Sequence, residues 1–220
     1  RQALCYAVDV DAVLDLTAEG HGTKVGSSMY PAFGKYFDES LADAYPYDVE
    51  KAKALLKEAG YDKGFELTIN FQVGDFAKSV CQIIQAELQQ IGVTVTLNQI
   101  EVANYANYLG EWDGILFHPM GLGNGQFSQV AANMIPGARF GTFLHDEKSV
   151  GLINEAIVSD QATLSKNLKE AVKILFQDNV ELYTVAITYS TAVTSPKLHG
   201  DYGAVQQYNA TWNELWKETE

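Results

Sequence analysis

The residues whose types and spacing most clearly suggest a functional site form a glycine-rich loop in the middle of the chain. The loop reads Gly121-Leu122-Gly123-Asn124-Gly125 and follows the apolar run 114–117, which predicts a buried strand. A dinucleotide-binding fingerprint has the spacing GxGxxG, whereas this loop has GxGxG and no clear helix start after it. Ligands of open α/β sheets also bind at the carboxyl ends of strands. The loop is therefore a simple turn, part of a binding cleft or, as an enzyme alternative, a nucleotide-cofactor site.

Other reactive side chains do not form a recognisable catalytic or metal-binding pattern. His21, His118, His145 and His199 are dispersed without HxxxH or HExxH spacing, and no GxSxG nucleophile motif occurs. Cys5 and Cys81 each lie in an apolar, helix-like stretch, which predicts two buried thiols. We therefore expect no catalysis, no metal and no cofactor, and we expect His118, directly after the predicted strand, to face a ligand.

Aromatic residues are abundant, with 12 Tyr, 10 Phe and 3 Trp. Several lie in irregular segments where no periodicity directs them inward, so they either pack on their own domain or line a binding cleft, where rigid rings provide large contact areas. Arg139, the only internal arginine, is either a surface cation or a ligand contact. The predicted ligand-binding set is Tyr30, Phe33, Phe117, His118, Met120, Gly121, Asn124, Phe127, Arg139 and Phe140.

Composition excludes several function classes. The chain has 220 residues, 28 acidic against 15 basic side chains, and a formal net charge of −13. Such a chain is repelled by nucleic-acid phosphates and by anionic membranes. It has no apolar run long enough for a membrane-spanning helix. It starts at Arg1 without a signal-peptide pattern, and we expect it to be a fragment or a processed product.

The elements that must position these residues follow from periodicity. We predict a helix over residues 2–15 and then an irregular segment over 17–46. A second helix over 49–59 is capped by Asp48 and closed by Gly60.

The middle of the chain predicts a βαβ unit. Residues 65–71 alternate as a strand, 77–91 have one apolar helical face, and 93–100 alternate again. Such crossovers are right-handed and parallel. Helices over 148–158 and 162–178 and a last strand over 183–189 complete an α/β fold with a mixed, mainly parallel sheet flanked by helices.

Four stretches resemble the peptide/nickel/dipeptide class of ABC-transporter solute-binding proteins, family 5. Arg1-Gln2-Ala3-Leu4-Cys5-Tyr6-Ala7-Val8-Asp9 is similar to the family's "RqAlayAiD" helix. Residues 47–61, with Ala52-Lys53-Ala54-Leu55-Leu56-Lys57-Glu58-Ala59-Gly60, resemble its "YDpekAkaLLaEAGy". Residues 64–67 and 84–93 are similar to "Gfel … iqaqLkkiGI", and the matches become sparse after about residue 100.

The resemblance implies a class II periplasmic-binding-protein-like fold. In this family two lobes close around a solute, and the motifs belong to the second lobe, so residues 1–220 are expected to be one domain, the C-terminal lobe, with the N-terminal lobe outside this chain. The implied partners are that lobe, ABC permease subunits and a peptide or similar small solute. The implied location is extracytoplasmic, in the periplasm of a bacterium or on its surface as a lipoprotein.

One departure from the family concerns the ligand. Many peptide-binding members carry an acidic segment after the third strand that holds a ligand ammonium, whereas residues 119–125 contain no carboxylate. A buried ammonium would lack its counter-charge there. The remaining alternatives are a ligand-sensing domain of a cytoplasmic transcriptional regulator with the same fold, which two reduced thiols would suit, and the nucleotide-cofactor enzyme domain.

Overall fold

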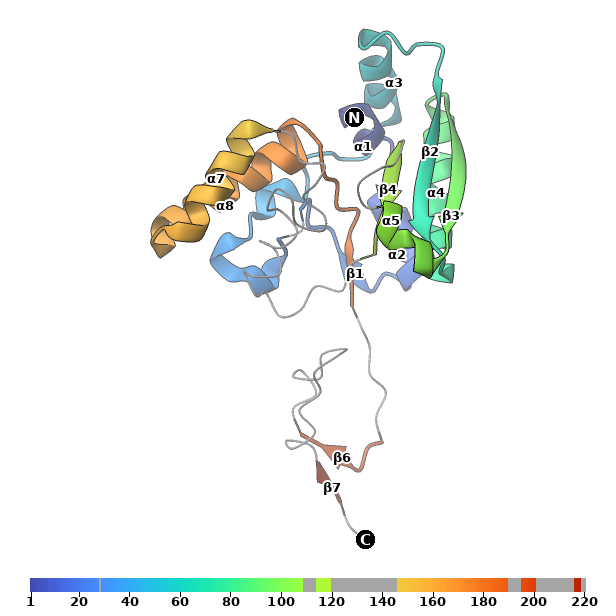
Figure 1. The fold of residues 1–220 in the computed structure, drawn as a ribbon. Coiled ribbons are helices and arrows are strands. Elements are labelled where there is room, and N and C mark those ends of the chain that lie inside the picture. Colours follow the sequence, from blue (N-terminus) through green and yellow to red (C-terminus); the bar gives the residue numbers. More distant parts are fainter. Residues whose placement is uncertain (28, 109–113, 120–145, 190–194, 201–215, 219–220) are drawn as a thin grey trace. The chain divides into compact units, whose positions relative to one another are not determined.

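The computed structural model describes residues 1–27, 29–108, 114–119, 146–189, 195–200 and 216–218 (Figure 1). The chain forms two compact units, residues 1–188 and 189–220. No helix among the described residues is both long and apolar enough to cross a membrane.

The amino-terminal residues form two short helices. α1 spans Gln2–Tyr6 and α2 spans Val10–Ala18, so the prediction of a single helix over residues 2–15 is wrong. Asp9 is extended, and its carboxylate accepts hydrogen bonds from the amides of Asp11 (3.1 Å) and Ala12 (3.2 Å). Because an N-cap satisfies the free amides of a first helical turn, Asp9 begins a new helix here.

The first unit contains a three-stranded parallel sheet. β2 (Phe65–Gln72), α4 (Asp75–Gln90) and β3 (Val93–Ile100) make the predicted βαβ unit, and β4 (Ile115–Phe117) pairs with the other edge of β2. The strand order is β3-β2-β4, and all three strands are parallel. The predicted strands over 65–71, 93–100 and 114–117 and the helix over 77–91 are confirmed, with α4 starting two residues earlier.

One face of this sheet packs on α4 and the amino-terminal helices. The strand residues that alternate toward this side are apolar, because successive side chains of a strand point to opposite faces. The first core contains, among others, Val8, Val13, Leu56, Ile69, Phe71, Val80, Ile84, Leu88, Val93 and Val95. Gly114, with φ 88°, lets β4 approach β2, since a Cβ there would lie 2.2 Å from the carbonyl oxygen of Thr68.

α3 (Val49–Glu58) follows the predicted pattern. The Asp48 carboxylate accepts a hydrogen bond of 2.9 Å from the Lys51 amide, and Gly60 follows the helix with φ 84°. Ala52 and Leu56 face the first core. The predicted helix over 49–59, its cap and its glycine stop are therefore confirmed.

A second core lies under α7 (Glu147–Val158) and α8 (Gln161–Lys173). α8 continues into a π-helical turn, η3 (Ile174–Asp178), so the predicted helix over 162–178 ends with altered hydrogen bonding. The irregular segment 17–46 contains two 3₁₀ turns, η1 (Pro31–Tyr36) and η2 (Glu39–Leu41), and it packs here. The buried members of this core are Met29, Phe33, Leu41, Ile153, Leu168, Ala171, Val172, Leu175 and Phe176.

The predicted strand over 183–189 is much shorter. Only β5 (Ile187–Thr188) pairs, antiparallel, with β1 (Gly22–Thr23). Tyr183 and Val185 pack against the first core as the alternation predicts. They belong to no ladder among the described residues, and a strand exists only where a neighbour accepts its hydrogen bonds.

The second unit contains a small antiparallel pair. β6 (Leu198–His199) pairs with β7 (Trp216–Lys217). The His199 ring stacks on Trp216 at 4.5 Å, and its Nε2 lies 3.0 Å from Glu218 Oε1. His199 therefore has a local role within this pair.

Candidate functional site

The carboxyl ends of the three parallel strands lie at one edge of the sheet. Register places Phe71 of β2 beside Gln99 of β3 and Phe117 of β4. After this point β2 ends with Gln72, and the Val73 amide donates a hydrogen bond of 2.9 Å to the Ile100 carbonyl. This edge is where ligands of open α/β sheets bind. His118, the residue after β4, lies here.

The sheet face opposite α4 carries two side-chain amides. Asn70 and Asn98 are register partners, and Asn98 Nδ2 donates to Asn70 Oδ1 at 2.7 Å. Asn70 Nδ2 donates in turn to the Ile115 carbonyl at 3.3 Å. The amides thus form a directed chain from β3 through β2 to β4. Because Asn70 is 3% exposed, these bonds also satisfy a buried polar group.

Tyr105 and His118 complete this face. Tyr105 belongs to α5 (Val102–Tyr108), and its hydroxyl lies 2.8 Å from His118 Nδ1. The two rings stack with centroids 5.4 Å apart and an interplanar angle of 16°. Tyr105 is 2% exposed and packs with Ile100 and Leu116, whereas His118 is half-buried. A buried tyrosine therefore fixes the orientation of a more accessible imidazole.

The arrangement is rich in hydrogen-bonding groups. The side chains named on this face are amides, a phenol and an imidazole, with no carboxylate, lysine or arginine among them. Such groups can orient the peptide bonds of a ligand by hydrogen bonding, and the rings supply contact area. The contact between Tyr105 and His118 holds the imidazole in place, and the side-chain amides offer donors and acceptors for recognition of a ligand.

The sequence-predicted site residues lie in different places. Tyr30 and Phe33 belong to the second core, where their rings meet edge to face at 4.8 Å and Phe33 is only 4% exposed. Phe117 is half-buried and packs against the first core, and His118 lies on the opposite face with Tyr105. The structure therefore does not bring Tyr30 and Phe33 together with His118. The other predicted contacts lie outside the described residues: Met120, Gly121, Asn124, Phe127, Arg139 and Phe140.

Sequence reasoning missed Asn70, Asn98 and Tyr105 as site residues. Asn70 lay on the predicted wet face of its strand, which was a usable signal, because a parallel βαβ unit aligns the same face of both strands. The only sequence signal for Tyr105 was its place in an aromatic cluster with Tyr108 and Trp112. Its pairing with His118 depends on α5, which the sequence did not predict.

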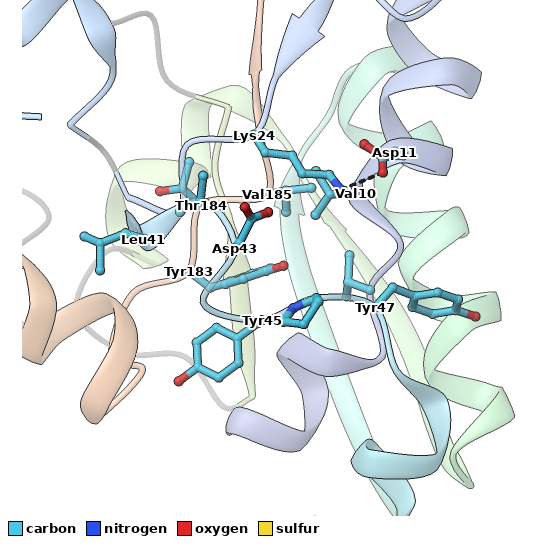
Figure 2. Close-up of a pocket in the computed structure, with 14 residues that line it drawn as sticks. Val10, Asp11, Lys24, Leu41, Asp43, Tyr45, Tyr47, Tyr183, Thr184 and Val185 are labelled. Atoms are coloured by element: carbon cyan, nitrogen blue, oxygen red, sulfur yellow. Dashed lines mark hydrogen bonds and ion pairs between the residues drawn. The ribbon is translucent and has the colours of Figure 1, made fainter. Parts of the chain in front are cut away.

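A separate pocket of about 160 Å³ lies between the start of α2, the segment 41–47 and the segment 183–185 (Figure 2). Lys24 Nζ forms an ion pair of 2.6 Å with Asp11 Oδ2 at its border. The Tyr45 hydroxyl donates to the Gln177 carbonyl, and burial raises the pKa of Tyr45 to about 12. Burial also raises the pKa of Tyr183, with smaller contributions from nearby Cys5 and Glu87, so both phenols are neutral.

Three further ionisable groups are buried: Cys5 of α1, and Cys81 and Glu87 of α4. Cys5 and Cys81 are buried and unbonded, as predicted, and burial raises the pKa of each thiol to about 12. Glu87 of α4 is 7% exposed, and its Oε2 has no hydrogen-bond partner in the described structure. Burial raises the pKa of Glu87 to about 7, although the Asp9 amide donates a hydrogen bond to the carboxylate. The raised pKa keeps both thiols protonated near neutral pH, and a thiol must ionise to act as a nucleophile.

Comparison with known proteins identifies the family. The sequence model of the bacterial extracellular solute-binding proteins, family 5 (Middle), matches residues 1–132. The chain belongs to this family. Among its curated relatives, heme-binding protein A of Haemophilus influenzae is 31% identical over 91% of this chain and 38% of its own length. The dipeptide-binding protein of Escherichia coli is 36% identical over 48% of this chain and 20% of its own length.

Solved structures agree with this family 5 assignment. The periplasmic binding protein DppA from Helicobacter pylori, in complex with the peptide STSA, is 26% identical with a TM-score of 0.67, covering 85% of this chain and 37% of that one. The dipeptide binding protein from a Pseudoalteromonas species, in complex with Met-Leu, has a TM-score of 0.77 over 99% of this chain and 44% of that one; at 20% identity it shows the fold alone. The predicted periplasmic-binding-protein-like α/β fold is therefore confirmed. The chain spans less than half the length of each relative and structure named here.

Proposed function

We propose that the chain is the substrate-binding part of an ABC importer, which captures a peptide or similar small solute and presents it to the permease. Membership of the family 5 solute-binding proteins is the observation that carries this proposal. Relatives bear the names dipeptide-binding, di/tripeptide-binding and glutathione-binding protein, and another is named for heme. The relatives are binding proteins and not enzymes, and nothing favours the cofactor-enzyme or regulator alternatives.

In this proposal the solute lies against the carboxyl ends of β2, β3 and β4. Asn98 and His118 provide hydrogen-bonding groups there, and Tyr105 positions the imidazole of His118. Of the sequence-predicted contacts, His118 has the position that best supports this role, and in the sequence the glycine-rich loop 121–125 follows it after Pro119 and Met120. Tyr30 and Phe33 contribute to the stability of the second core, which supports a structural role for them.

We further propose that the chain works as one lobe of a two-lobed protein located outside the cytoplasm. Its coverage of 37% and 44% of two solved binding proteins supports this role. The solute would then bridge two lobes and favour the closed state through its higher affinity for that state. The partners are the other lobe and the permease subunits. Because this chain supplies only part of the contacts, we expect it to bind the solute weakly by itself.

Solute titration followed by NMR tests the proposal. The ¹⁵N-labelled chain is titrated separately with Met-Leu, the peptide STSA, glutathione and hemin. We expect at least one of them to shift the amides of Asn98, Tyr105 and His118 and to be recovered with unchanged mass. Tyr105→Phe keeps the ring but removes the hydroxyl contact with His118, and should weaken binding about three- to tenfold.

Tyr61→Phe is the matched control, because Tyr61 is exposed and lies before β2 at its amino end. Its affinity should equal that of the unmodified chain. The proposal is overturned if none of the four solutes shifts the three site amides, or if the solute that binds is chemically converted.

A further inference from the structure

The pocket described above has a lining that none of the preceding roles uses. Its walls combine apolar side chains, including Val8, Val10 and Val185, with two carboxylates and one lysine. Figure 2 shows the Asp43 carboxylate and the Tyr183 ring turned toward the middle of the lining residues, while the Tyr45 ring points away. The pocket is therefore amphipathic, with an apolar wall and one acidic side chain, Asp43, which remains exposed to solvent.

The charges around the pocket are unequal. Lys24 is neutralised by its 2.6 Å ion pair with Asp11. No ion pair involves Asp43 among the residues that the structure describes. One negative charge therefore remains at the pocket, on the solvent-exposed carboxylate of Asp43. Since the whole chain carries a formal charge of −13, its field also favours a cation over an anion.

The shape limits what such a cation can be. A bare divalent metal ion requires about six or more oxygen ligands, which one inward carboxylate does not provide. A cavity of about 150 Å³ can hold a molecule of the size of benzene, and this pocket has about 160 Å³. The apolar wall favours a short hydrocarbon body, and the face of an aromatic ring such as Tyr183 attracts ammonium groups.

We propose that this pocket binds a small organic cation, a primary ammonium group on a short apolar body, with Asp43 as its counter-charge. Asp43 accepts hydrogen bonds from the ammonium group, and the valines and the Tyr183 ring enclose the hydrocarbon part. This pocket is distinct from the proposed solute site at the strand ends, because Asn98, Tyr105 and His118 are not among its lining residues. It does not depend on the proposed import function.

Three probes with one carbon skeleton test the proposal: 3-methylbutylammonium, 3-methylbutan-1-ol and 3-methylbutanoate. Each is added to the ¹⁵N-labelled chain at about pH 7.5 and low salt, where the ammonium is charged. The ammonium probe should shift the amides of Asp43, Thr184 and Val185 with a dissociation constant on the order of millimolar, as expected for about six non-hydrogen atoms. The alcohol should bind about tenfold more weakly, and the carboxylate should not bind.

Two variants separate a specific site from general attraction to an acidic chain. Asp43→Asn preserves the shape and should weaken ammonium binding about tenfold, to the level of the alcohol. Asp62→Asn removes the same charge from an exposed residue outside the pocket and should leave the affinity unchanged. Raised ionic strength should weaken binding of the ammonium but not of the alcohol.

Several results would overturn the proposal. It fails if the ammonium and the alcohol bind with equal affinity, or if Asp43→Asn leaves ammonium affinity unchanged. It also fails if Asp62→Asn weakens ammonium binding as much as Asp43→Asn does, or if the probe shifts only amides outside the pocket. Failure here would leave the importer proposal intact, because that proposal is tested by solute-induced shifts of the amides of Asn98, Tyr105 and His118.

Discussion

Replacement of Glu87 by glutamine should make the chain more stable at neutral pH. Glu87 of α4 is buried beside Asp9 at the start of α2, and one of its carboxylate oxygens has no partner in the described structure. Burial raises its pKa from 4.5 to about 7. Between these two pH values the carboxyl group is protonated in the folded state and ionised in the unfolded state. Glutamine has nearly the same shape and no ionisation, so it removes this cost.

The direction and size follow from the two pKa values. Below pH 4.5 both states are protonated and Glu87 contributes no pH dependence. As the pH rises toward 7, the unfolded state loses its proton first, so the free energy of unfolding falls. The full penalty above pH 7 is roughly 3 kcal/mol, and about 2 kcal/mol of it develops between about pH 5.5 and pH 8.

Urea unfolding of both proteins at these two pH values measures the effect. Other groups also titrate, so the informative quantity is the difference in free energy of unfolding between Glu87→Gln and the unmodified chain. That difference should favour the variant by about 2 kcal/mol more at the higher pH. Glu58→Gln, at an exposed position of α3, is the control and should show no such change. A difference that is the same at both pH values would refute the reasoning.

Three further expectations concern stability and reactivity. Asp48→Ala removes the carboxylate that caps α3 and should lower the free energy of unfolding by about 1 kcal/mol in urea titrations; an unchanged urea midpoint would contradict the cap. Asn70→Ala and Asn98→Ala should each lower the free energy of unfolding by about 1–3 kcal/mol. The double variant should lose less than the sum, because both substitutions break the same chain of hydrogen bonds; strictly additive losses would contradict this coupling. Cys5 and Cys81 should react with a thiol reagent at about pH 8 only after unfolding, since both are buried and their pKa is raised to about 12. Rapid labelling of either thiol in the folded chain would contradict this expectation.

The βαβ unit was predictable because its signals are local. Phe65 to Phe71 alternate, Val80 to Leu88 recur at helical spacing, and Gly92 ends the helix, so each element is visible within its own residues. The division of the first helix at Asp9 was not predictable from the apolar stripe. The aspartate acts as a cap only because the chain becomes extended at that residue.

The long-range contacts were beyond sequence reasoning. An irregular, aromatic segment predicted either packing or ligand contact for Tyr30 and Phe33, and burial against residues of α8 supports packing. Likewise, His118 was predicted from its place after a strand. Its partner Tyr105 became visible only once α5 had brought the phenol onto the same face of the sheet.

Hydrogen–deuterium exchange of the chain tests the central claim most directly. Exchange is measured with and without the solute that binds most tightly in the NMR titration. We predict that bound solute slows exchange at the carboxyl ends of β3 and β4 and in α5, around Ile100, Tyr105 and His118, and leaves α7 and α8 unchanged. Protection confined to α7 and α8, or absent from the strand ends, would contradict the claim that the solute lies against this edge of the sheet.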